Sequence, residues 1–360
     1  MIHGLTLLFV SLASLLLPAK AEMVFAGDAM QHQSQLDAAR TSNGGYDYSD
    51  YFAAIEPYIQ SADMAVVNLE IPLGGKPYSG YPMFCAPDDY AKALKDAGFD
   101  FFLTANNHML DRRDRGLRRT IGVLDSLGVE SIGIYDSKES RSARLPKIVN
   151  VKGFKVGMLN YTYGTNGITI QGNVVVDYID HSLIERDVAQ TRAGGAEIVC
   201  VCLHWGEEYH LLPTAGQKRL ADRLTKLGVD LIIGGHPHVI QPMELRDNPC
   251  GKKSLVVYSL GNFISGMRTT DTRGGALVRV SLERDSLGEA RVADASYRMV
   301  FTVPPGYDSR NYHLIPAECS APSGAEGMRK GFWNNAKRVF DRHNIRVPLD
   351  TLAIAHYNQQ

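Results

Sequence analysis

Short apolar runs with strand character alternate with helical segments along most of this chain, and this alternation limits its fold more than any other feature. The strand-like runs lie at 23–26, 64–69, 101–105, 196–203, 229–233 and 255–260, and the predicted helices at 88–98, 112–127, 182–193 and 217–227. Residues 147–151 and 155–161 flank Lys152 and Gly153 as a predicted hairpin. The succession predicts an α/β fold with a layered sheet sandwich flanked by helices.

Five of the strand-like runs end at or beside a residue able to bind a metal ion. These residues are Asp28, Glu70, Asn107, His204 and the pair His236 and His238. Ligands in α/β folds bind beyond the carboxyl ends of strands. Taken alone, each side chain also fits a structural role as a turn, cap or core residue. Together, five ends that supply only oxygen and nitrogen donors predict one cation site.

The stretch 234–240 lies at the centre of this pattern. It follows the apolar run 229–233, and its two glycines precede His236, Pro237 and His238. In an extended segment residues two apart point to the same side, and Pro237 restricts the backbone between the histidines. We therefore expect both imidazoles to face one cavity. The alternative is a tight turn that carries two surface histidines.

The predicted donor set has a definite chemistry. Two carboxylates, one amide oxygen and three imidazoles suit one or two divalent ions, with Mn²⁺, Zn²⁺ or Fe as candidates. Such ions lower the pKa of a bound water to near neutrality. His108 follows Asn107 in the chain, and we expect it to donate a proton to a leaving group. Asn106 and Asn262 are expected to support the ligands.

Composition excludes some classes of function. A formal net charge of -1 gives no sign of nucleic-acid binding. Five cysteines in 360 residues do not make a disulfide framework, and Cys200 and Cys202 are predicted to be small buried hydrophobes.

The N-terminal segment has the pattern of a signal for export from the cytoplasm. Residues 5–17 form an apolar run that is short for a membrane span, and Ala19-Lys20-Ala21 has the form of a cleavage site. We interpret residues 1–21 as a signal peptide, which predicts a secreted or periplasmic protein. An anchor that stays uncleaved near the membrane is the alternative, because the segment before the apolar run has no lysine or arginine. Residues 22–300 are predicted to form the domain, and 301–360 a helical extension packed on it.

Six blocks, in order along the chain, resemble the CapA family. They are Gly27-Asp28, Asn68-Leu69-Glu70, Asn106-Asn107-His108, His204-Trp205-Gly206, Gly235-His236-Pro237-His238 and Ser259-Leu260-Gly261-Asn262-Phe263. Proteins of this family are associated with bacterial poly-γ-glutamate and capsule synthesis, and their domain is similar to calcineurin-like metallophosphoesterases. The resemblance spans roughly residues 22 to 265 and implies a fold of that type.

The resemblance also implies residue roles. One metal site would use Asp28, Glu70 and His238, the other would use Glu70, Asn107, His204 and His236, and His108 would be the general acid. Two positions depart from the phosphoesterase pattern. Met30 stands where those enzymes carry a histidine, and a thioether is a poor ligand for such ions. Glu70 replaces an aspartate. Both changes argue against ordinary phosphoesterase activity.

A basic helix face follows His108. Arg112, Arg115 and Arg119 fall on one side of the predicted helix and would hold a polyanion by charge-assisted hydrogen bonds. The alternative is a solvated surface balanced by Asp111 and Asp114.

The function that the resemblance implies is that of a CapA-type capsule synthesis protein. It would be a metal-dependent hydrolase or acyl transferase that acts on, transfers or anchors an anionic polymer such as poly-γ-glutamate, together with the envelope polysaccharide machinery. Two alternatives remain open: a metallophosphoesterase acting on phosphate esters, and a non-catalytic polymer-binding scaffold.

Overall fold

A computed structural model describes residues 20–249 and 251–351 of the chain. The apolar run of the predicted signal peptide lies outside these residues. Lys20 and Ala21 open the first strand, β1 (Lys20–Ala29), where they pair with Glu283 and Leu282. Within the described ranges, no helix has the length and apolar character needed to span a membrane.

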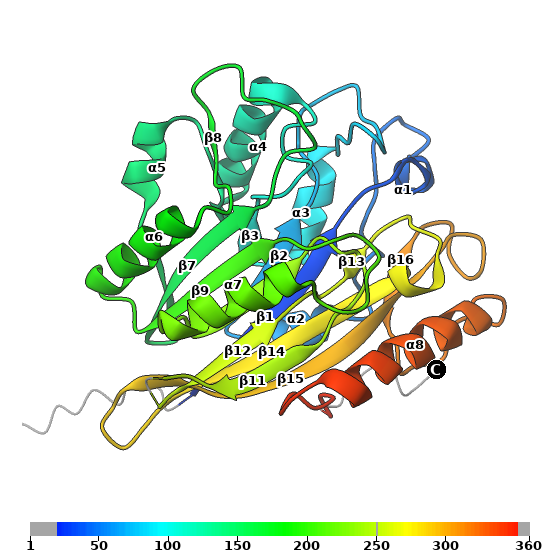
Figure 1. The fold of residues 1–360 in the computed structure, drawn as a ribbon. Helices are drawn as coiled ribbons and strands as arrows, with labels where there is room; N and C mark the ends of the chain where they lie inside the picture. The colour runs from blue at the N-terminus through cyan, green and yellow to red at the C-terminus, as the bar shows by residue number, and fades with distance from the viewer. Residues whose placement is uncertain (1–19, 250, 352–360) are drawn as a thin grey trace, which may run out of the picture.

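Two large β-sheets form the centre of the molecule (Figure 1). The first has the order β16-β15-β14-β1-β2-β3-β4, with β13 pairing β1 off this path, and the second has the order β11-β12-β10-β9-β7-β6. The other strands of the first sheet are β2 (Met64–Leu69), β3 (Phe101–Leu103), β4 (Glu130–Ile132), β13 (Asn262–Ile264), β14 (Gly274–Arg284), β15 (Ala290–Val303) and β16 (His313–Pro316). Those of the second are β6 (Lys147–Val151), β7 (Phe154–Thr162), β9 (Ile198–His204), β10 (Leu231–Gly235), β11 (Met243–Asp247) and β12 (Lys253–Val257). The hairpin predicted around Lys152 is confirmed as β6 and β7.

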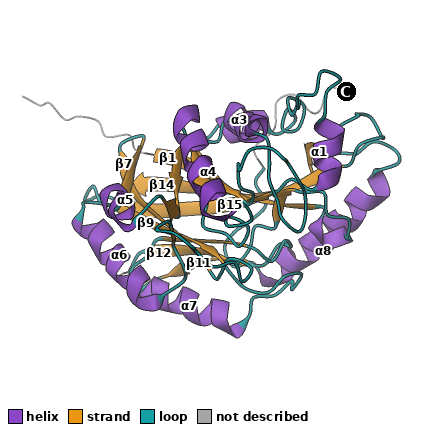
Figure 2. Cartoon of the chain, turned by 90° about the horizontal axis from the view of Figure 1, so that it is seen from above, coloured by secondary structure: helices purple, strands orange, loops and turns teal. Residues whose placement is uncertain are grey.

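Helices surround the sheets, as the view from above shows (Figure 2). They are α1 (Gln33–Ala39), α2 (Glu56–Gln60), α3 (Asp88–Asp96), α4 (Arg113–Leu127), α5 (Lys138–Arg144), α6 (His181–Ala193), α7 (Ala215–Lys226) and α8 (Glu326–His343). A short 3-10 helix, η1 (Thr270–Thr272), and the strand pair β5 (Ile134–Tyr135) and β8 (Val175–Val176) complete the elements of the described chain. The predicted class, a layered α/β fold flanked by helices, is confirmed.

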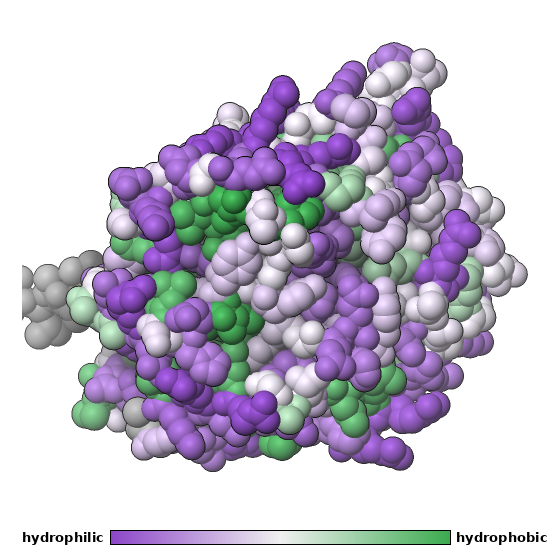
Figure 3. Space-filling model, turned by 45° about the horizontal axis from the view of Figure 1, so that its top comes forward, coloured by the Kyte–Doolittle hydropathy of each residue, from purple (hydrophilic) through white to green (hydrophobic). Residues whose placement is uncertain are grey.

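The core lies between the two sheets. Phe25 and Val66 of the first sheet belong to the same buried apolar cluster as Met158, Cys200 and Leu231 of the second. Each fully buried side chain of this size contributes about 1.5–3 kcal/mol through burial, so this cluster holds the layers together. Cys200 and Cys202 are free and buried, as predicted. The outer surface is different: strongly hydrophilic residues dominate the edge of the face in Figure 3, around a paler centre.

Strand register determines where the site lies. β1 and β2 run parallel with Asp28 opposite Asn68, and β9 and β10 run parallel with His204 opposite Gly235. The carboxyl ends of both sets of strands therefore meet at one edge of the sandwich, where ligands bind in α/β folds.

The C-terminal part of the chain continues the sandwich. Residue 300, the predicted end of the domain, lies inside β15, and β16 pairs with β15 in the same sheet. Helix α8 then packs on the sandwich core through Phe332 and Phe340. After α8 the chain bridges both sheets, because Ile345 pairs with Glu244 of β11 and Leu349 pairs with Tyr297 of β15.

Candidate metal centre

The side chains at the strand ends converge in one buried cluster. Asp28, Glu70, Asn107, His204, His236 and His238 are all buried. Single donor atoms of Glu70, His236 and His238 lie within 4.8 Å of one another, and the same holds for Asp28, Glu70 and His204. Glu70 belongs to both groups, which is the position expected of a carboxylate shared by two ions.

Individual contacts link five of the six residues into one network. His204 Nε2 lies 2.6 Å from Asn107 Oδ1 and 3.4 Å from Glu70 Oε1. His238 Nδ1 lies 3.4 Å from Asp28 Oδ2, and its Nε2 lies 3.8 Å from Glu70 Oε1. The structure thus brings together every residue that the sequence proposed as a ligand.

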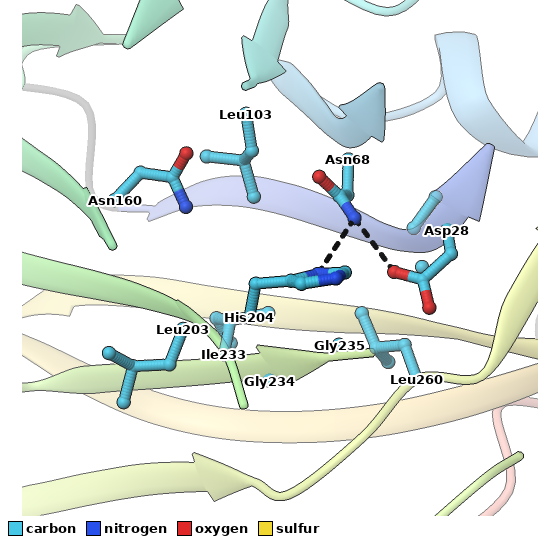
Figure 4. A pocket seen from close by; sticks show the side chains of 12 residues that line it. Asp28, Asn68, Leu103, Asn160, Leu203, His204, Ile233, Gly234, Gly235 and Leu260 are labelled. Carbon is cyan, nitrogen blue, oxygen red and sulfur yellow. Dashed lines mark hydrogen bonds between the residues drawn. The ribbon is translucent and has the colours of Figure 1, made fainter. Parts of the chain in front are cut away.

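Asn68 connects the two sheets within this cluster, and the sequence pattern assigned it no role. Its side-chain amide donates to Asp28 Oδ1 at 2.8 Å and lies 3.3 Å from His204 Nδ1 (Figure 4). Asp28 belongs to the first sheet and His204 to the second. Asn68 therefore fixes the orientation of one predicted ligand from each layer. Its sequence signal was its place in the Asn68-Leu69-Glu70 block, two residues before Glu70.

Burial keeps two of the imidazoles neutral. It lowers the pKa of His204 to about 3 and, with the help of the neighbouring histidines, the pKa of His236 to about 2. Neutral imidazoles offer a lone pair to a cation. Burial alone would raise the pKa of Asp28, but a hydrogen bond from His238 and the nearby imidazoles outweigh it, and the pKa falls to about 2. At neutral pH these three groups are in the protonation states that metal binding needs.

Glu70 is the clearest sign that this cluster suits a cation. Neither of its carboxylate oxygens has a hydrogen-bond partner, and His236 Nδ1 has none either. Burial, together with the negative charge of Asp28, raises the pKa of Glu70 well above its usual value. A buried carboxylate without partners costs several kcal/mol. Because a divalent ion would remove this cost, the residues present fit a divalent metal.

The backbone conformation of the His-Pro-His segment differs from the predicted one. His236 and His238 have φ values of 97° and 57°, so the segment is a left-handed turn and the extended geometry expected from the sequence is wrong. Positive φ in residues other than glycine costs about 1–3 kcal/mol and occurs mostly at functional sites. The His236 amide donates to Asp28 Oδ2 at 3.1 Å, and the two imidazole rings lie 5.8 Å apart.

His108 lies beside the cluster and is held from three sides. Its Nδ1 lies 2.9 Å from Asp111 Oδ2 and 3.4 Å from the side-chain amide of Asn166. The Phe84 ring packs edge-on against the imidazole at 4.6 Å, and the Phe84 amide donates to the same Asp111 oxygen at 2.8 Å. His108, Asn107 and Asp111 line an open cleft of about 450 Å³. The sequence pattern missed Phe84 and Asn166, and it considered Asp111 only as a balancing charge.

Of the two asparagines expected to support the ligands, Asn262 contacts the predicted ligand His238, and Asn106 contacts the backbone on either side of the site. Asn106 accepts a hydrogen bond from the His108 amide at 3.2 Å and donates to the Leu69 carbonyl at 2.8 Å. Asn262 Oδ1 lies 3.1 Å from His238 Nδ1, and its amide donates to the Thr272 carbonyl at 2.9 Å.

The arginines after His108 make mostly internal contacts. Arg119 binds both oxygens of Asp88 at 2.7 Å, and Arg112 donates to the Pro77 carbonyl at 3.1 Å. Arg115 is exposed. Arg119 thus ties α4 to α3, and Arg112 contacts the loop 72–87. Their partners are Asp88 and a backbone carbonyl rather than Asp111 and Asp114, the balancing acids expected from the sequence. Polymer binding by this helix face stays a prediction.

Fold and site together define a class: an α/β sandwich protein with a buried carboxylate and imidazole centre for divalent metal. Residues 22–267 match the family described as "Bacterial capsule synthesis protein PGA_cap", and the chain belongs to this family. The predicted relation to CapA is thereby confirmed.

Relatives and solved structures add detail. The "Capsule biosynthesis protein CapA" of Bacillus anthracis is 28% identical over 278 residues, which cover 73% of this chain and 64% of that protein. The chain therefore spans slightly less than two thirds of that relative's length. The "PGA biosynthesis protein CapA" of Bacillus subtilis is 27% identical over 282 residues, 76% of this chain and 71% of that protein. A putative 5'-nucleotidase from Staphylococcus aureus is similar with a TM-score of 0.47 and 15% identity, over 87% of this chain and 58% of that one. This likeness is too distant to bear on function.

Proposed function

We propose that the protein is a metal-dependent hydrolase or acyl transferase that acts on γ-glutamyl amide bonds of an anionic capsule polymer. The observation that carries the proposal is Glu70, which is fully buried among imidazoles and a second carboxylate and has no hydrogen-bond partner. The capsule synthesis family supports the polymer as substrate class. The predicted signal peptide supports action outside the cytoplasm, next to the envelope polysaccharide machinery.

The residues divide the chemistry between them. Asp28, Glu70, Asn107, His204, His236 and His238 would hold one or two divalent ions, of Mn²⁺, Zn²⁺ or Fe. Bound ions supply Lewis acidity and a water of lowered pKa. With its Nδ1–H directed at the Asp111 carboxylate, the protonated His108 ring would pass the proton on Nε2 to the leaving amine. Asn106, through the His108 amide, holds the imidazole next to the predicted ligand Asn107.

The test uses the full chain with Mn²⁺ or Zn²⁺ and two substrate panels, γ-glutamyl amides and phosphate esters. We expect cleavage or transfer of the amides, abolished together with metal binding in His236→Ala. The control is His210→Ala, because His210 is exposed outside the cluster. Turnover of phosphate esters alone would identify a phosphoesterase. Metal binding without turnover of either substrate panel would favour the third alternative, a non-catalytic polymer-binding scaffold.

A further inference from the structure

Exposed aromatic side chains gather around the metal centre. Among the described residues, nine large hydrophobic side chains are exposed, and four of them, Tyr81, Met83, Tyr163 and Tyr209, surround the centre. The Tyr163 ring lies 4.5 Å from His236, and the Tyr209 ring lies 6.2 Å from His238. Tyr81 and Met83 line the cleft beside His108. Exposed aromatic groups at a cleft mark a binding surface.

Carboxylates line this cleft together with the imidazole of His108. Two acids, Asp111 and Glu208, belong to its described lining, and no lysine or arginine does. Asp111 already accepts hydrogen bonds from His108 and from the Phe84 amide. Glu208 is exposed. The charge available to a ligand in the cleft is therefore the carboxylate of Glu208.

Glu208 lies among the tyrosines. Partial burial and the nearby Glu208 carboxylate raise the pKa of Tyr163 to about 12, and the same two causes raise the pKa of Tyr209 to about 12. Both phenols stay neutral at physiological pH, so their rings present negative faces and add no charge. A carboxylate beside aromatic faces, with no lysine or arginine in the described lining, attracts a cation.

We propose that this cleft binds a primary ammonium group of the substrate, with Glu208 as counter-ion, the Tyr81 ring in the lining, and the rings of Tyr163 and Tyr209 next to it on the side of His236 and His238. The identity of the substrate rests on the proposed function: in a γ-glutamyl chain the ammonium group is the amino terminus. Interior units of such a polymer carry carboxylates and no ammonium. The cleft therefore selects chain ends over chain interiors.

The test compares a γ-glutamyl tripeptide that has a free amino terminus with its N-acetylated form. Binding is measured by calorimetry on the full chain, with and without Mn²⁺, and cleavage is measured separately. We expect the free amine to bind about tenfold more tightly, in line with a cation held by aromatic faces and one carboxylate. Glu208→Gln should abolish this preference, and Tyr163→Ala should reduce it.

Two variants serve as matched controls. Glu207→Gln removes the neighbouring exposed acid, and Tyr307→Ala removes an exposed tyrosine (45%) that does not line the cleft. Both should keep the wild-type preference. Equal or tighter binding of the acetylated peptide, or a preference that survives Glu208→Gln, would overturn the inference. Because binding is measured apart from cleavage, a preference without cleavage contradicts only the proposed reaction, and cleavage without a preference contradicts only the ammonium site.

Discussion

His238 Nε2 lies 3.8 Å from Glu70 Oε1, and the pKa of both groups is raised above its usual value. Burial alone would lower the pKa of His238, but the carboxylates of Glu70 and Asp28 outweigh it and raise the pKa to about 9. A protonated imidazole therefore takes the place that a cation would otherwise occupy. A metal ion entering the cluster has to displace this proton, so metal and proton compete for the site.

This competition predicts how stability depends on pH. His238 holds its proton more tightly in the folded chain than in the unfolded chain, where its pKa is near 6.5. The resulting stabilisation is complete below pH 6.5 and is lost as the pH rises to about 9. We expect the metal-free protein to lose about 3 kcal/mol of unfolding free energy over this window. Urea unfolding in the presence of a chelator measures it.

Variants separate His238 from other titrating groups. His238→Asn should remove most of the slope between pH 6.5 and 9, and His210→Asn, at an exposed position, should keep it. In Mn²⁺ the slope should weaken or reverse, because metal binding improves as protons leave. An unchanged slope in His238→Asn would contradict the assignment.

Single residues of the candidate site were predictable where they directly follow an apolar, strand-like run in the sequence. Asp28, Glu70, His204 and the His-Pro-His pair follow apolar strands, and that position identified them. The position of a residue after an apolar strand does not identify Asn68, Phe84 or Asn166. Each acts through a contact between segments distant in sequence, such as Asn166 with His108, and a local pattern does not contain that information.

At the scale of single elements, β10 and its following turn depend on glycine. A Cβ atom on Gly235 would lie 2.6 Å from Asp28 Oδ1, closer than real contacts allow. Gly235 therefore leaves room for a carboxylate of the other sheet.

Gly235→Ala should displace Asp28 and weaken metal binding at least tenfold, because the carboxylate has to move away from its ligand position. Metal titration followed by calorimetry measures the effect. Gly164→Ala is the matched control, since a Cβ there meets nothing within 4 Å. Equal metal affinity in both variants would show that Asp28 is not a ligand.

Helices and strands were predictable where neighbouring residues in the sequence indicate them. The helix expected at 88–98 is α3 (Asp88–Asp96), and the expected hairpin is β6 and β7. The left-handed turn at His236 and His238 was missed because non-glycine residues rarely adopt it, so no residue preference indicates it. β16 was missed because only four residues form it, and they are a strand only through pairing with β15.

On the scale of the whole molecule, the C-terminal residues fasten α2 to the first sheet. Asp350 accepts a hydrogen bond from the Tyr58 hydroxyl at 2.6 Å, and Arg279 lies over the Tyr58 ring at 4.5 Å and near Asp350 at 3.4 Å. These groups are buried. The end of the described chain is thereby joined to α2, far away in sequence.

Tyr58→Phe should lower the free energy of unfolding by about 1–3 kcal/mol, because a buried carboxylate loses a hydrogen bond. Urea denaturation measures the change. Tyr307→Phe, on an exposed tyrosine, should change stability by less than about 0.5 kcal/mol. A Tyr58→Phe variant as stable as the wild type would mean that the C-terminal residues add little to the stability of the sandwich.

The pairing of β1 has a consequence for how the protein is made. The first strand of the described chain lies between β2 and β14, with Lys20 opposite Glu283. During synthesis one edge of β1 stays without its partner until most of the polypeptide has left the ribosome, and contacts this remote in sequence form slowly. One edge of this apolar strand is therefore unpaired during most of the synthesis of the chain. The yield of folded protein will depend on what covers that edge until β14 has been made.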